Sequence, residues 1–238
     1  QGTADPGTAA EVIADVRRDG RVGLFFDEGA AVLAAYGVSV CPFAYLEEEE
    51  DDDDGTRLLD EVGSPLVLKI DAPDLAHRFE QDAVILGIET ADALREAIRR
   101  LRQVVDSLKL REARLLAQKM IDGRELIFGL EQDPTFGPAV MFGVGGTLVE
   151  ALKDVAFGVA PISEGQAEQM IRSIRAFPLL EAFRGQPAVA LAPLVRITTA
   201  LARIGLEVPE IVELDLNPVI ADERGAVAVD VLIRLRDA

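Results

Sequence analysis

The chain has 238 residues, of which 49% are apolar and 28% charged, and this composition is typical of a folded globular protein. The length suits one large domain or two closely joined domains. No stretch approaches the roughly 18 consecutive apolar residues of a membrane span, so we expect no membrane partner. Acidic residues outnumber basic ones by 42 to 24, and the resulting formal charge of −18 argues against a nucleic-acid partner.

The number of cysteines indicates the redox environment of the protein, and the N-terminal sequence indicates whether the chain is part of a longer one. Cys41 is the single cysteine, so no internal disulfide can form, and we expect a reducing, cytoplasmic setting. The N-terminal QGTADPGTAA carries neither an initiator methionine nor the basic and apolar pattern of a signal peptide. We therefore expect this sequence to be part of a longer natural chain with further domains.

The spacing of apolar residues predicts a mixed α/β chain. Amphipathic spacing predicts helices, and short apolar runs between turn residues predict strands. The expected helices are at 11–36, 91–108, 164–176 and 188–204, and the expected strands at 38–46, 64–70, 83–88, 113–121, 123–132, from 138 onward, 211–220 and 226–233. Strict βαβ repetition is lacking, which excludes a Rossmann sheet, and there are no internal repeats.

A block of like charge, EEEEDDDD at 47–54, cannot lie in a core. A calcium-binding loop would need interleaved glycines and a fixed spacing of ligands, which this block lacks. We interpret it as a solvated loop or edge without a function of its own.

Two segments could meet a phosphate group. Lys69 ends the apolar run LVLK, and a lysine that points from a strand into a cleft can bind phosphate oxygens, although a surface lysine has the same pattern. Gly143, Gly145 and Gly146 follow a predicted strand, where glycines let the backbone approach a ligand and present N–H groups to an anion. The segment matches neither a Walker A loop nor G-x-G-x-x-G, so a generic glycine turn is the alternative.

The C-terminal segment ELDLNPVIADERGAVAVD, residues 213–230, gathers oxygen ligands. Alternation along a strand places Glu213, Asp215 and Asn217 on one face, and the returning strand brings Asp230 beside them. Carboxylates and an amide are the ligands that Mg²⁺ prefers when it binds nucleotide phosphates. A polar edge hairpin would look similar, and both interpretations stay open on this evidence alone.

Several motifs follow one another in an order that resembles a known family: AAVLAAYGV, SPLVLKIDAPDLAHR, GRELIFGLEQDPTFGPAVMFGVGGTLVEALKDVAF, LLEAFRG, and ELDLNPV with AVDVLI. From about residue 27 to its end, the chain resembles the ATP-grasp domain of NDP-forming acyl-CoA synthetases. Within this family it is most similar to the ADP-forming acetate–CoA ligases, which are related to the β subunit of succinyl-CoA synthetase.

The resemblance implies a two-lobed ATP-grasp fold that holds ATP and Mg²⁺ between its lobes. We expect an N-terminal extension or linker at 1–26, a small lobe at 27–112 and a large lobe at 113–238. Lys69 would approach the phosphates, the segment Gln118, Lys119 and Met120 would form a hinge whose backbone meets adenine, and Glu125 would lie nearby. Asp215, Asn217 and Asp230 would hold the metal, while Arg78, Arg184 and the three glycines would complete the nucleotide site.

The resemblance also gives His77, the only histidine, a role. Members of the family carry His-Lys here, and the histidine is proposed to relay a phosphoryl group between a phosphohistidine of the CoA-binding partner domain and the nucleotide. A neutral imidazole is a competent nucleophile near neutral pH. Elsewhere the chain departs from the family. Asp82-Ala83 replaces a glycine pair, which puts a negative charge where phosphate oxygens should lie, and Ala182 replaces a glycine.

Two functional hypotheses follow. In the first, the chain is the ATP-grasp domain of an ADP-forming acyl-CoA synthetase, an acid–thiol ligase that works through phosphohistidine with a CoA-binding partner domain or subunit. In the second, it is a degenerate ATP-grasp module that regulates or scaffolds a larger fusion, for example one with an acetyltransferase domain.

Overall fold

The computed structural model describes residues 5–46, 55–73, 75, 81–146, 154–182, 185 and 187–237. The acidic block at 47–54 and the predicted site residues His77, Arg78 and Arg184 lie outside these ranges. The chain divides into two compact units, Gln1–Val40 together with Asp122–Ala238, and Cys41–Ile121. Within the described ranges, no helix is both long and apolar enough to cross a membrane.

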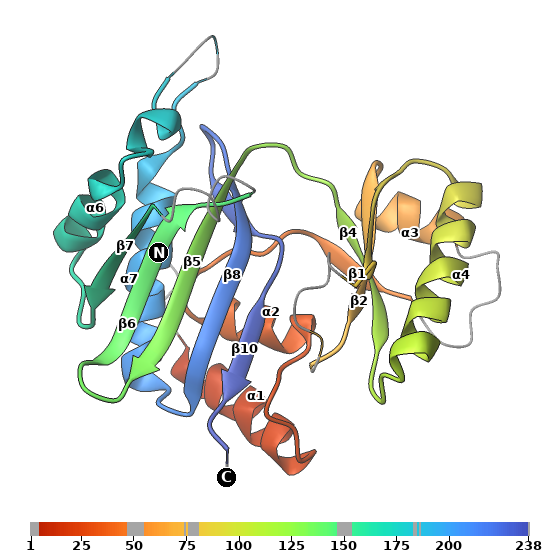
Figure 1. Cartoon of the computed structure of the whole chain (residues 1–238), viewed down its shortest axis with the longest axis horizontal. Helices are drawn as coiled ribbons and strands as arrows, with labels where there is room; N and C mark the ends of the chain where they lie inside the picture. Colours follow the sequence, from red (N-terminus) through yellow and green to blue (C-terminus); the bar gives the residue numbers. More distant parts are fainter. Residues whose placement is uncertain are drawn as a thin grey trace. The chain divides into compact units, whose positions relative to one another are not determined.

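The smaller unit is a four-stranded antiparallel sheet in the order β1-β4-β2-β3, with helices on one face (Figure 1). Leu66, Leu68 and Ile70 alternate along the central strand β2 and share one buried cluster with Leu94 and Leu101 of helix α4. The elements are β1 (Phe43–Tyr45), α3 (Gly55–Val62), β2 (Leu66–Asp71), β3 (Val84–Ile88), α4 (Ala91–Leu108) and β4 (Arg114–Lys119).

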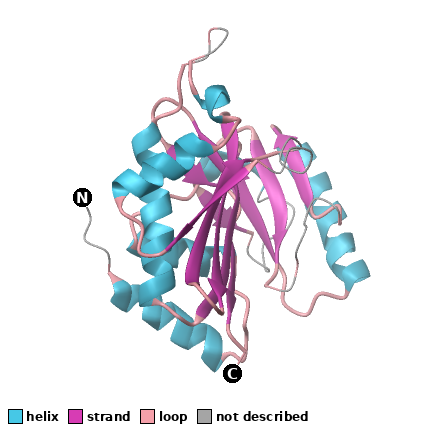
Figure 2. Cartoon of the chain, turned by 60° about the vertical axis from the view of Figure 1, so that its left-hand side comes forward, coloured by secondary structure: helices cyan, strands magenta, loops and turns pink. Residues whose placement is uncertain are grey.

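The larger unit is built on an antiparallel sheet in the order β10-β8-β5-β6-β7, to which β9 adds beside β8. Its helices lie against one face, which buries Phe128, Leu130 and Phe142 (Figure 2). The elements are α1 (Pro6–Arg18), α2 (Phe26–Ala35), β5 (Arg124–Asp133), β6 (Gly137–Val144), β7 (Val155–Val159), α6 (Glu164–Ser173), the 3-10 helix η2 (Phe177–Leu180), α7 (Leu191–Glu207), β8 (Ile211–Ala221), β9 (Ala226–Ala228) and β10 (Leu232–Leu235).

The predicted mixed α/β class and most predicted elements are confirmed, and α4 has the predicted bounds. Two predictions are corrected. The helical stretch 11–36 is two helices, α1 and α2, and the expected strand 226–233 is two short strands. β9 and β10 pair with β8 in one register, Ala228 with Val219 and Leu232 with Asp215, and they are separated by residues 229–231, where Val229 N–H still donates to Pro218 O at 3.1 Å. The sequence analysis did not predict α3 or β7 as separate elements.

The compact units differ from the lobes expected at 1–26, 27–112 and 113–238. Residues 27–40 belong to the larger unit because α2 packs beside α1, and Gly29 lies against Val231 and Ile233 at β10. Residues 113–121 belong to the smaller unit because β4 pairs with both β1 and β2. The first 26 residues are not only a linker, because Ala9, Ile13 and Val16 of α1 are buried.

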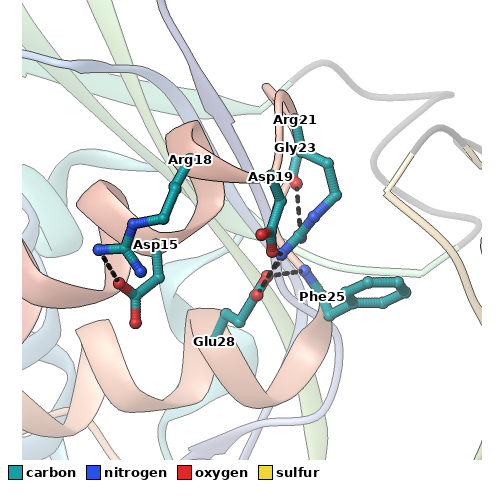
Figure 3. Close-up of polar contacts among 7 residues, drawn as sticks. All are labelled: Asp15, Arg18, Asp19, Arg21, Gly23, Phe25 and Glu28. Atoms are coloured by element: carbon teal, nitrogen blue, oxygen red, sulfur yellow. Dashed lines mark hydrogen bonds and ion pairs between the residues drawn. The ribbon is translucent and has the colours of Figure 1, made fainter.

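A charged cluster fixes the connection between α1 and α2 (Figure 3). Arg21 donates to both carboxylate oxygens of Glu28, at 2.8 and 2.6 Å, and the same carboxylate accepts from Phe25 N–H at 2.8 Å. The Arg21 side chain is only 12% exposed and that of Glu28 21%. Figure 3 also shows the pair Arg18–Asp15 on α1, whose side chains are 73% and 65% exposed.

Replacing Arg21 should therefore destabilise the larger unit. We expect Arg21→Ala to lower the free energy of unfolding by about 1–3 kcal/mol, because a largely buried carboxylate loses its paired donors. The matched control is Arg18→Ala, which removes an exposed pair and should change that free energy by less than about 0.5 kcal/mol. Urea unfolding of both variants measures the two changes in free energy. Equal changes would contradict a stabilising role for the Arg21–Glu28 pair.

Tyr36, the residue that ends α2, should titrate abnormally. The residue is 7% exposed, and burial, assisted by the Glu207 carboxylate, raises its pKa to about 12. Burial favours the neutral phenol, so the neutral form of Tyr36 stabilises the folded protein. This contribution is complete below the pKa of an unfolded tyrosine, about 10, and is lost as the pH rises through the pKa of Tyr36 in the folded protein.

The chain has two tyrosines, so Tyr45→Phe leaves Tyr36 as the only one. We expect the phenolate absorbance of this variant to rise with a midpoint near pH 12 in the folded protein. In urea the midpoint should return to about 10. The same midpoint in both solvents would contradict the burial of Tyr36.

Candidate functional site

Lys69 and Gln118, two of the predicted nucleotide residues, lie on one face of the sheet of the smaller unit, whereas Lys119, which pairs with Leu66, lies on the other face. Along β2, Leu66, Leu68 and Ile70 belong to the buried cluster with α3 and α4, so Val67, Lys69 and Asp71 point to the opposite face. Antiparallel register then places Gln118, Leu116 and Arg114 of β4 beside them. We call this the polar face, and it is defined by Tyr45, Lys69, Asp71, Arg114 and Gln118.

Side chains on the polar face are unusually buried for their chemistry. Lys69 is 4% exposed, Asp71 0% and Gln118 3%, and these are three of the four buried polar or charged residues in the described part of the chain. The Gln118 amide nitrogen has no hydrogen-bond partner among the described residues. A buried donor without a partner costs about 1–3 kcal/mol, so an acceptor from a ligand would be stabilising here.

A second group lies at the end of the polar face where β2 ends at Asp71. The Tyr45 hydroxyl donates to Asp71 Oδ2 at 2.5 Å, and the Arg114 guanidinium stacks 4.0 Å from the centre of the Tyr45 ring. Sequence reasoning missed these three residues. Asp71 could have been found, because it lies two positions after Lys69 and strand alternation places both on one face. Tyr45 and Arg114 required the register of three strands, which no local pattern gives.

The predicted hinge is used in part by the fold itself. Lys119 N–H donates to Pro42 O at 3.2 Å, and Met120 N–H donates to Pro65 O at 3.0 Å. These two N–H groups are therefore engaged within the fold, and the expectation that the backbone of the hinge meets adenine stays a prediction. Among the described residues, the Gln118 amide nitrogen has no hydrogen-bond partner, so it is a donor that adenine could use at this position.

The predicted glycine turn also needs a correction. Gly143 pairs with Ile127 of β5, and Gly145 continues this pairing because its N–H donates to Glu125 O at 2.6 Å. The expectation that Gly143 and Gly145 present N–H groups to an anion is thus wrong. Gly146 has φ +76°, and a Cβ there would lie 2.7 Å from Glu125 Oε2. Gly145 and Gly146 let the backbone pass close to Glu125, and this close approach explains why both positions are glycine.

The C-terminal strands bring the predicted metal ligands together in the larger unit. The face of β8 that carries Asp215 and exposed Asn217 is opposite to the face of buried Leu214 and Leu216. Leu232 pairs with Asp215, and Val229 N–H donates to Pro218 O, so the intervening Asp230 lies beside this part of β8. No group of three or more His, Cys, Asp or Glu is arranged for a metal within the described ranges. The donor set is two carboxylates and one amide, all oxygen ligands.

The replacement of the glycine pair by Asp82-Ala83 is accommodated within the smaller unit. Asp82 adopts φ +55°, a left-handed conformation that glycine adopts easily and aspartate tolerates better than most residues. Its carboxylate pairs with Arg100 of α4 at 3.3 Å. Ala83 is completely buried, and its carbonyl accepts from Ile70 N–H at 2.9 Å. The charge of Asp82 is thereby directed to α4, which weakens the expected repulsion of phosphate.

Comparison with known proteins agrees with this arrangement. The model of the ATP-grasp domain matches residues 15–235, and the chain belongs to this family. The β subunit of acetate–CoA ligase (ADP-forming) I from Pyrococcus furiosus is 39% identical over 226 residues, which cover 93% of this chain and 95% of that subunit. Acetate–CoA ligase (ADP-forming) I from Archaeoglobus fulgidus is 37% identical over 205 residues, but these are 85% of this chain and only 30% of that protein.

The fold is shared with a solved structure, the dinucleotide-forming acetyl-coenzyme A synthetase 1 of Ca. Korarchaeum cryptofilum. The similarity has a TM-score of 0.80 and 35% identity, and it covers 96% of this chain and all of that one. That structure contains coenzyme A and Mg-AMPPCP, and its phosphohistidine segment points towards the nucleotide binding site. The predicted ATP-grasp fold and family are confirmed, and the match to a complete β subunit favours the synthetase hypothesis over the degenerate module.

The close approach over Glu125 predicts a stability effect. A Cβ on Gly145 would lie 2.8 Å from the Glu125 carbonyl carbon and 3.0 Å from its Cβ. We expect Gly145→Ala to lower the free energy of unfolding by about 1–3 kcal/mol, because backbone must move. The matched control is Gly165→Ala in α6, where a Cβ meets nothing within 4 Å and should be neutral or stabilising. Thermal unfolding compares the two variants, and a neutral Gly145→Ala would contradict the packing.

Proposed function

We propose that this chain is the nucleotide-binding subunit of an ADP-forming acyl-CoA synthetase. The enzyme would convert a carboxylic acid, CoA and ATP into acyl-CoA, ADP and phosphate. Membership of the ATP-grasp family and the names of the relatives support this proposal. The observation that carries it is the polar face, where Lys69, Asp71 and Gln118 are buried on the one sheet face that is not covered by α3 and α4.

Lys69 and Gln118 of the polar face have chemical roles in this proposal. The Lys69 ammonium supplies a compact positive charge to phosphate oxygens, and its burial strengthens that attraction because less water competes. The Gln118 amide donates to an acceptor nitrogen of adenine, which satisfies the donor that has no partner in the described residues. From Gln118 to Arg114 the strand rises about 13 Å, which leaves room for a nucleotide to lie along β4.

Asp215, Asn217 and Asp230 of the larger unit fit a magnesium ion by their chemistry. Mg²⁺ is held in proteins by one or two carboxylates and takes its remaining ligands from phosphate and water. Two carboxylates and an amide match that set, and they contain no sulfur or nitrogen ligand that would favour zinc. When bound, the ion would neutralise charge on the phosphates.

The remaining parts of the proposal concern residues and partners beyond the described structure. His77 is proposed as the residue that relays the phosphoryl group, with Arg78 and Arg184 as contacts to the nucleotide. A partner subunit related to the α subunits of such ligases would supply the acyl and CoA sites, and we propose a cytoplasmic location. An acetyltransferase domain fused to this chain remains a prediction.

Isothermal titration calorimetry with AMPPCP tests the proposal. We expect the chain to bind AMPPCP, and we expect the affinity to rise when Mg²⁺ is added. In the variant Asp215→Asn, Mg²⁺ should no longer change the affinity. Lys69→Met should weaken binding by roughly 10- to 100-fold, because a charge-assisted hydrogen bond is worth about 1.5–3 kcal/mol.

The matched control is Lys109→Met, which removes an exposed lysine at the end of α4. Its affinity for AMPPCP should equal that of the unmodified chain. An unmodified chain that binds no AMPPCP with or without Mg²⁺ would overturn the proposal, and so would equal losses from Lys69→Met and Lys109→Met.

A further inference from the structure

The two edges of the sheet of the larger unit differ in their backbone hydrogen bonding. At one edge, β10 is paired further by the segment before α2, because Leu24 N–H donates to Ile233 O at 3.1 Å and Leu235 N–H donates to Val22 O at 2.7 Å. At the other edge lies β7, whose single strand neighbour among the described residues is β6 (Figure 1). The β7 edge therefore leaves backbone groups available.

The hydrogen-bond pattern shows which groups these are. Ala160 N–H donates to Pro138 O at 2.8 Å, so residues 138 and 160 form a hydrogen-bonded pair. Such pairs alternate in an antiparallel ladder, so Val140–Gly158 and Phe142–Ala156 are the next ones. The N–H and C=O groups of Val155, Phe157 and Val159 must then point away from β6. No other backbone partner is recorded for them among the described residues.

The side chains of β7 lack the usual protection of an edge strand. Charged residues and proline prevent unwanted pairing in most edge strands, but VAFGV contains neither. A Cβ on Gly158 would meet Ile162 and Met170 at α6, so Phe157 and Val159 face the opposite side. There Phe157 is 68% and Val159 48% exposed.

We propose that two copies of this chain associate by antiparallel pairing of their β7 strands, around a two-fold axis at Phe157. The outward groups lie at positions 155, 157 and 159, which are symmetric about Phe157, so two identical strands satisfy all of them at once. Val155 of each copy then pairs with Val159 of the other, and the two Phe157 side chains lie opposite each other on the same face. The pairing joins two sheets into one continuous sheet.

Charge at the ends of β7 is compatible with this pairing. The Asp154 carboxylate accepts from the backbone N–H groups of Arg175 and Ala176, at 3.0 and 2.6 Å. In the symmetric register Asp154 lies opposite Ala160 rather than opposite its own copy. No like charges therefore face each other along the paired strands.

The association should be weak and dependent on salt. A five-residue strand with one large apolar side chain buries less than the roughly 800 Å² per partner of a standard stable interface. Each copy also carries a formal charge of −18, and this repulsion is screened by salt. We therefore expect a monomer–dimer equilibrium that shifts towards the dimer as protein or salt concentration rises.

Cysteine crosslinking of the full chain tests the register. The native Cys41 is buried, so Phe157→Cys adds the single accessible thiol of the described residues. Paired strands hold opposite Cα atoms about 5.5 Å apart, within the range that a disulfide spans. Under mild oxidation we expect Phe157→Cys to form a covalent dimer. The matched control is Phe136→Cys in the β5–β6 turn, where the native side chain is 69% exposed, and it should stay monomeric.

Sedimentation velocity of the unmodified chain gives an independent result. We expect the fraction of dimer to increase with salt concentration. The variant Phe157→Lys should form no dimer, whereas Phe136→Lys should leave the monomer–dimer equilibrium unchanged. A monomer at every protein and salt concentration overturns the proposal. Equal crosslinking of the Phe157→Cys and Phe136→Cys variants overturns it as well, because the contact would then not be located at β7.

Discussion

The alternation of side chains across the β2–β4 pair is the constraint on which the candidate site depends. Because successive residues of a strand point to opposite faces, one strand can serve a core and a site at once. Leu66, Leu68 and Ile70 commit one face to the helices, and this fixes Lys69 and Asp71 on the other. A shift of one residue in register would exchange the two sets. Burial of Leu66, Leu68 and Ile70 on one face thus fixes Lys69 on the opposite face.

The glycine turn shows how one residue type can have two explanations. Glycine after a strand suits phosphate binding, and it also suits a backbone that passes close to another one. The contacts of Gly145 and Gly146 with Glu125 favour the second explanation for these positions. A similar exchange occurs at Asp82, which adopts a left-handed conformation where the resembled family has glycine. Conformation is retained there, while the side chain gains a partner on α4.

Local pattern was sufficient for most of the helices and strands and for part of the site. Helix α4 was predicted with its observed bounds, because its apolar residues recur every three or four positions. Asp215 and Asn217 were predicted on one face because alternation along β8 requires no knowledge of its neighbours. What the sequence could not give was pairing. The Tyr45–Asp71–Arg114 group depends on the order β1-β4-β2, and the engaged N–H groups of Gly145, Lys119 and Met120 depend on contacts between distant segments.

The smaller unit is an insertion, since the larger unit contains residues on both sides of it in the sequence. During synthesis, helices α1 and α2 leave the ribosome long before β10, the strand against which Gly29 packs. The insertion can complete its own sheet in the meantime, because all four of its strands lie between residues 43 and 119. The larger unit must wait for the last strands of the chain. Its first two helices therefore lack this packing partner until β10 has been synthesised.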